Sequence, residues 1–248
     1  MPDFRLSVCM AVHNGARFLR PQVDSILAQL RPGDELLVVD DASTDGSVAL
    51  LESMRDGRMQ VYRNEQNLGV VPSFDKALRR SSGEIIFLSD HDDIWLPGKV
   101  AASLAVFAAD PEVTMVVTDA KLIDEQGKVT KESFFAERGN FAAGFLHNFV
   151  KNKYLGCTLS FRRSMLRYFL PIPHDVPMHD MWFGLLNAIY GKTFFIAESL
   201  TAYRRHAGNA TPLVTSGQLG KILRWRWRLA TNIGARVLRG GREATLEA

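Results

Sequence analysis

The stretch "EIIFLSDHDDIWLP" (residues 84–97) places Asp90, Asp92 and Asp93 directly after a short apolar run. Such a run predicts a strand buried in a sheet. Clustered carboxylates repel one another, so solvent, a helix N-terminus or a cation must offset the repulsion. A helix start explains one aspartate, which we expect to be Asp93. We therefore expect Asp90 and Asp92 to direct oxygens to one hard divalent cation, Mn²⁺ or Mg²⁺.

The rest of the first half alternates apolar runs with helical patterns. Strands are expected at 5–12, 34–41, 59–64 and 84–90. Helices are expected over 19–30, after 41 with Ser43 or Thr44 as the cap, and over 71–83 with Gly83 as the stop signal. The alternation predicts an α/β fold with a mostly parallel central sheet and helices on both faces.

The second half is richer in β-structure. Strand-like runs cover 113–123, 157–163, 192–197 and 199–205, and one helix is expected from Asp180 to Gly191. No linker rich in Pro, Gly or Ser interrupts the chain. We expect one domain over 1–216, with a nucleotide-binding half (1–110) and an acceptor half (111–216), followed by a basic tail (217–248).

The composition indicates a globular protein. Apolar residues make up 46% of the 248 residues and charged residues 23%. Two distant cysteines, Cys9 and Cys157, provide neither a disulfide framework nor zinc spacing, and they suit a reducing compartment. We see no signal peptide and no apolar run long enough to span a bilayer, so a cytoplasmic location is expected.

Three polar groups follow expected strands: "HNG" (13–15), "DDASTD" (40–45) and "SDHDD" (89–93). In parallel α/β sheets ligands bind beyond the carboxyl ends of the strands, so these groups would share one rim. A carboxylate in the second group could accept from the imide N–H of uracil or thymine, or from ribose hydroxyls. We favour this role for Asp41, whereas for Asp40 a turn or cap is an equal alternative.

Taken together, these segments resemble family 2 glycosyltransferases, which have the nucleotide-diphospho-sugar GT-A fold. The resemblance covers about residues 5–210 and is carried by "SVCMAVHNGARFLRPQVDSILAQ", "ELLVVDDASTDGS", "NLGVVPSFDKAL", "GEIIFLSDHDDIW" and "HDMW". It implies an inverting, metal-dependent enzyme that moves a sugar from a nucleotide-diphosphate donor to an acceptor hydroxyl.

The resemblance also implies roles for single residues. Ala11, His13 and Asp41 would line the nucleoside pocket, although many members have Tyr at the position of His13. Asp90 would contact the nucleotide and, with Asp92, form the D-x-D motif, in which Asp92 is the main metal ligand.

Asp180 would be the catalytic base by the same resemblance. An apolar pocket would raise its pKa toward neutrality, as a base requires. Helix capping is the structural alternative for Asp180, and His179 is the alternative base. His206, in "YRRHAGN" (203–209), is expected to contact the metal or the diphosphate.

The motifs "LSDHDDIW" and "YRRHAGN" are similar to rhamnosyltransferase-like members that build lipopolysaccharide O-antigen or related surface glycans. This similarity suggests L-rhamnose, a dTDP- or UDP-linked donor, and a glycan or lipid-linked acceptor. Two other classes stay open: a phosphatase-like or nucleotidyltransferase enzyme of sugar nucleotides, and a non-catalytic carbohydrate- or membrane-binding protein.

The tail is expected to form an amphipathic helix. Basic residues gather on one side (Lys221, Arg224, Arg228, Arg239) and apolar residues on the other (Leu219, Ile222, Leu229, Ile233, Val237). It would lie on the cytoplasmic face of an inner membrane or pack on the body or a second copy, and we favour the membrane. The slightly acidic body and the lack of a binding motif argue against nucleic acid.

Overall fold

A computed structural model describes residues 3–176, 178–206 and 219–240. Its sheet has the strand order β3-β2-β1-β4-β8-β6-β9-β5, with β7 paired to β6. The strands are β1 (Leu6–Val12), β2 (Glu35–Asp40), β3 (Met59–Arg63), β4 (Ile85–Asp90), β5 (Ile94–Trp95), β6 (Val113–Ile123), β7 (Val129–Lys131), β8 (Leu159–Arg162) and β9 (Lys192–Arg204). The α/β expectation is confirmed.

The first half of the sheet is entirely parallel. β1 pairs with β2 and with β4, and β2 pairs with β3, all in parallel register. β8 then joins β4 in antiparallel register, and the second half mixes both kinds of pair. The parallel strands all end at one rim, where the three polar groups follow them.

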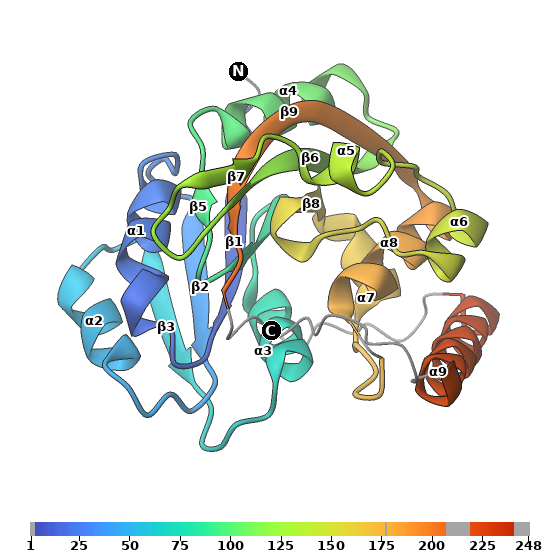
Figure 1. Ribbon diagram of the computed structural model, residues 1–248, viewed down its shortest axis with the longest axis horizontal. Coiled ribbons are helices and arrows are strands. Elements are labelled where there is room, and N and C mark those ends of the chain that lie inside the picture. Colours follow the sequence, from blue (N-terminus) through green and yellow to red (C-terminus); the bar gives the residue numbers. More distant parts are fainter. Residues whose placement is uncertain (1–2, 177, 207–218, 241–248) are drawn as a thin grey trace.

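Helices cover both faces of the sheet, as expected (Figure 1). One face packs against α1 (Ala16–Leu27), α2 (Ser47–Met54) and α4 (Lys99–Ala109). The other packs against α3 (Val70–Arg80) and α8 (His179–Tyr190). The short elements are α5 (Phe134–Glu137), α6 (Phe145–Val150), α7 (Leu166–Phe169), η1 (Gly156–Thr158) and η2 (Arg163–Met165). The sheet therefore separates two apolar cores.

Some expected boundaries are wrong for identifiable reasons. β9 is one continuous strand where two were expected, because shifts of register against β6 absorb the irregularity near Ser199. α2 begins at Ser47. The Ser43 hydroxyl does not cap this helix but accepts a hydrogen bond from the Asn14 N–H. α3 ends at Arg80, and Gly83 has another role: a Cβ there would lie 2.5 Å from backbone atoms of Leu6.

The tail forms helix α9 (Leu219–Leu238), and part of its apolar face packs on the protein body. Leu229 and Ile233 are buried in the core cluster that contains α8. Arg226 donates to the Val150 carbonyl at 3.0 Å and Arg236 to the Pro171 carbonyl at 2.6 Å. Packing on the body, the alternative we did not favour, is thus what the helix does. Among the described helices, none has the length and apolar character needed to cross a membrane.

Candidate active site

Hydrogen bonds join the loops that follow β1 and β2. The Asn14 N–H donates to the Ser43 hydroxyl at 2.9 Å, and Nδ1 of His13 lies 2.8 Å from the Asp41 carbonyl oxygen. The two loops therefore form one rim, as their positions in the sequence predict.

The predicted nucleoside residues lie at this rim. The Asp41 carboxylate accepts from the Asn64 side chain and from the Leu68 and Gly69 N–H groups at 2.7–2.9 Å, and so holds the turn before α3. Ala11 is opposite Asp90 in the β1–β4 register. The structure thus gives Asp41 a structural role, and its contact with a base stays a prediction.

Asp93 is not a helix-start residue, so that expectation was wrong. It lies between β4 and β5, and α4 begins only at Lys99. Its side chain is fully buried, and Oδ1 accepts from the Arg204 N–H at 2.9 Å. A residue 111 positions away decides this placement, which no local pattern could indicate.

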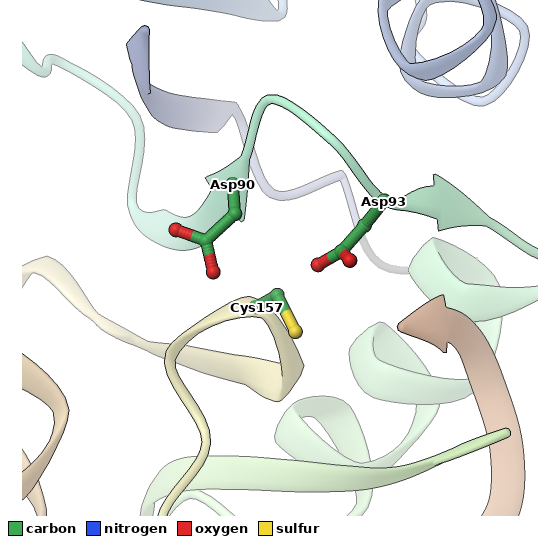
Figure 2. Close-up of side chains that lie close together, drawn as sticks. All are labelled: Asp90, Asp93 and Cys157. Carbon is green, nitrogen blue, oxygen red and sulfur yellow. The ribbon is translucent and has the colours of Figure 1, made fainter. Parts of the chain in front are cut away.

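Asp90, Asp93 and Cys157 converge below the rim (Figure 2), with ligand atoms within 4.8 Å of one another. Burial, then the charges of Asp92 and Asp180, raises the pKa of Asp90 to about 7. Burial also raises the pKa of Asp93 and of the Cys157 thiol well above their usual values. Cys157 is fully buried, and its closeness to the carboxylates had no signal in the sequence.

His206 and Asp92 meet although 114 residues separate them. Nε2 of His206 lies 2.8 Å from Oδ2 of Asp92, and both side chains are largely buried. The Arg204 guanidinium donates to the Asp92 backbone carbonyl at 2.8 Å, which fixes the end of β9 against the D-x-D loop. Two predicted metal ligands are therefore brought together by the fold.

Asp180 is the second residue of α8, and its carboxyl group is buried. It accepts from the Met181 N–H at 2.5 Å, and burial raises its pKa to about 7. The charge of Asp180 helps to raise the pKa of Asp90, so the two carboxyl groups lie within electrostatic reach of each other. His179 stacks on Phe74 with ring centres 4.2 Å apart, and burial lowers its pKa to about 4. The environment of Asp180 suits a base near neutral pH better than that of His179.

Lys99 is a buried cation beneath the site, and no sequence pattern singled it out. Its ammonium donates to the Cys157 carbonyl at 2.5 Å and to the Thr201 hydroxyl at 2.6 Å, and it lies 4.8 Å from the Trp95 ring centre. Burial lowers its pKa to about 8. Lys99 thus ties α4, η1 and β9 together next to Asp90 and Asp93.

The donor set fits a divalent cation. Asp90 and Asp92 offer carboxylate oxygens and His206 a ring nitrogen, which are ligands that Mn²⁺ and Mg²⁺ accept. Burial raises the pKa of Asp90 most, and the neighbouring charges of Asp92 and Asp180 raise it further, so a bound cation would offset part of this cost.

Residues 7–170 match the family described as Glycosyl transferase family 2, and the chain belongs to that family. It is 27% identical over 218 residues to an uncharacterized glycosyltransferase of Nostoc, covering 83% of this chain and 66% of the relative. It is 26% identical over 192 residues to the Escherichia coli UDP-Glc:alpha-D-GlcNAc-diphosphoundecaprenol beta-1,3-glucosyltransferase WfgD, covering 75% of this chain and 72% of WfgD. The chain thus spans about two thirds of the length of these relatives.

Solved structures show the same fold. The Staphylococcus aureus TarS fragment 1–349 in complex with UDP-GlcNAc aligns with a TM-score of 0.72 at 18% identity, over 94% of this chain and 69% of TarS. The mannosyltransferase PcManGT of Pyrobaculum calidifontis, in complex with GDP-Man and Mn²⁺, aligns with a TM-score of 0.64 at 20% identity, over 99% and 66%. The fold is therefore GT-A, as the sequence resemblance implied.

Proposed function

We propose that the chain is an inverting glycosyltransferase that moves a sugar from a nucleotide-diphosphate donor to an acceptor hydroxyl. One observation carries the proposal: the fold brings Asp180 close enough to the D-x-D loop that its charge, like that of Asp92, acts on Asp90. Family membership supports the same class of reaction.

Asp92, Asp90 and His206 would hold the divalent cation. When bound, the cation offsets the negative charge that develops on the departing diphosphate. The complex of PcManGT with GDP-Man and Mn²⁺ supports the presence of such an ion.

Asp180 is the proposed base. Its carboxylate takes the proton of the acceptor hydroxyl as the hydroxyl oxygen forms a bond to the anomeric carbon and the bond to the diphosphate breaks. The N–H groups around Asp180 fix the carboxylate, and its burial keeps water away and makes it more basic than an exposed aspartate.

For the donor we propose dTDP-L-rhamnose, on the similarity of the D-x-D and "YRRHAGN" segments to rhamnosyltransferase-like members. A UDP-linked sugar is the alternative, supported by the UDP-GlcNAc complex of TarS and by the donor in the name of WfgD. A thermal-shift screen of nucleotide sugars with Mn²⁺ separates them, because a ligand that binds the native state raises its stability.

The proposed acceptor is a lipid-linked glycan at the cytoplasmic face of a membrane, in surface polysaccharide synthesis. The acceptor in the name of WfgD, a diphosphoundecaprenol, supports a lipid-linked substrate. Since Leu229 and Ile233 pack on the body, α9 would meet the membrane through its opposite side, where Trp227 is 68% exposed and Arg224 is exposed; Arg228 is exposed too but pairs with Asp175 at 3.9 Å. Exposed arginines beside an aromatic ring suit anionic lipid.

Transfer assays with Asp92→Ala and Asp180→Asn test the function. Both variants are expected to lose transfer by about a hundredfold or more. If Asp180→Asn transferred sugar at a near-normal rate while Asp92→Ala was inactive, Asp180 would not be the catalytic base, but the protein would still be a glycosyltransferase. Release of inorganic phosphate or pyrophosphate instead of a nucleoside diphosphate would reject the class.

A further inference from the structure

A hollow of about 210 Å³ lies between α5 and the end of β9, outside the carboxylate cluster. It is lined by residues from three segments: Leu122, Phe134, Glu137, Arg138, Tyr203 and Arg205. The rings of Phe134 and Tyr203 meet edge to face, with centres 5.8 Å apart. The hollow is small beside ligand pockets of about 300–1,000 Å³, so it suits one charged group with part of a sugar ring.

Two arginines stand over this aromatic pair. The guanidinium carbon of Arg138 lies 5.0 Å from the Phe134 ring centre, and that of Arg205 lies 5.8 Å from the Tyr203 ring centre. Arg205 also donates to the Tyr203 hydroxyl at 3.2 Å. Stacking and hydrogen bonding hold the guanidinium planes before a ligand arrives, which lowers the cost of binding.

The charge in the hollow is positive. Within the described ranges, neither Arg138 nor Arg205 has an ion-pair partner, and the one acidic lining residue, Glu137, is paired with Lys131 at 3.2 Å. The Lys153 ammonium donates to the backbone carbonyls of Arg138 and, at 3.2 Å, Gly139, which adds positive charge near Arg138. A planar guanidinium is the side chain best suited to bind a carboxylate or phosphate through two parallel hydrogen bonds.

The hollow adjoins the reaction centre. Arg205 precedes His206, which contacts Asp92. The buried Tyr203 ring is close enough to Cys157 and Asp93 for their charges to act on it. The charge of Arg138 reaches Asp180, where it offsets a small part of the rise in pKa that burial causes. A group bound in the hollow would therefore lie within electrostatic reach of the proposed base, among residues from the second half of the chain.

We infer that this hollow binds a phosphate or carboxylate group of the acceptor and so selects acceptors with an anion near the reacting hydroxyl. The inference rests on the proposed function. A phosphate could also come from the donor diphosphate, and the two sources are separable by experiment.

The test uses the full chain and two probes measured by calorimetry: inorganic pyrophosphate with EDTA, and UDP or dTDP with Mn²⁺. The variants are Arg138→Gln and Arg205→Gln. The matched control is Arg167→Gln, because Arg167 is exposed and stacks on a tyrosine, Tyr168, at 4.6 Å but lies on α7, away from the hollow.

We expect each hollow variant to weaken pyrophosphate binding about ten- to a hundredfold, as loss of hydrogen bonds to a charged group predicts. Nucleotide binding should change by less than about twofold, and Arg167→Gln should match the wild type. Two results overturn the inference: pyrophosphate binding that is absent or insensitive to both variants, or an equal loss for both probes, which assigns the arginines to the donor. Absence of UDP and dTDP binding in the wild type would instead reject the proposed function.

Discussion

Nε2 of His206 lies 2.8 Å from Oδ2 of Asp92, across 114 residues of chain. This contact joins the loop after β4 to the end of β9, the longest strand of the sheet. The metal proposal depends on it, because His206 adds a ring-nitrogen ligand from a distant segment to the carboxylates of the loop.

His206→Ala is expected to weaken Mn²⁺ binding about ten- to a hundredfold, because it removes a ligand or the group that orients Asp92. Electron paramagnetic resonance of free Mn²⁺ measures this without an activity assay. His174→Ala is the matched control, since His174 is exposed. Equal Mn²⁺ affinity in the two variants would exclude His206 from the site.

Asp180→Asn should make the protein more resistant to heat at pH 8 than the wild type, with a smaller difference at pH 5. Burial raises the pKa of Asp180 to about 7 in the folded state, from 3.8. The folded state thus binds the proton more tightly, and this stabilisation is present at low pH and lost as the pH rises through about 7. Melting curves at both pH values should show a gain of a few degrees at pH 8. A loss at pH 8 would contradict the assignment.

The rate of transfer by the wild type should rise with pH through about 7, because the base must be ionised. A pH–rate profile at saturating substrate measures this. A rate that is flat from pH 5 to 9 would argue against a buried carboxyl base.

Lys99→Met should lower the melting temperature by about 6 °C or more. The substitution leaves the buried Cys157 carbonyl and Thr201 hydroxyl without their charged donor, at about 1.5–3 kcal/mol for each such bond. Differential scanning fluorimetry measures the change. Lys128→Met, at an exposed position, should melt within about 1 °C of the wild type. Equal melting temperatures of the two variants would show that the hydrogen bonds of Lys99 do not stabilise the fold.

Gly83→Ala should be strongly destabilising although Gly83 lies outside every helix and strand. An added Cβ would lie 2.5 Å from backbone atoms of Leu6 and Ser7, which belong to the central strand β1 and cannot yield as a flexible side chain can. Chemical denaturation should show a loss of about 2–4 kcal/mol. Gly57→Ala, where the added Cβ would meet open space, is the control.

The amino-acid sequence determined the parallel half of the sheet and the rim. Strand and helix patterns along the first half fix which segments pair, and the carboxyl ends of parallel strands must meet at one edge. This geometry carries Asp41, Asp90 and Asp92 to the site, and the family motifs add Asp180.

Only the tertiary structure decided the rest. Asp93 was expected at a helix start because the residues around it are compatible with one. In the structure its side chain instead accepts a hydrogen bond from the Arg204 N–H. Lys99 follows "WLPG" like an ordinary surface lysine, yet β9 and η1 close over it. The apolar stripe of α9 fits a membrane and a protein surface equally well. In the structure, Leu229 and Ile233 pack into the apolar core of the protein. In each case the deciding partner lies far away in the chain, where periodicity and local motifs carry no information.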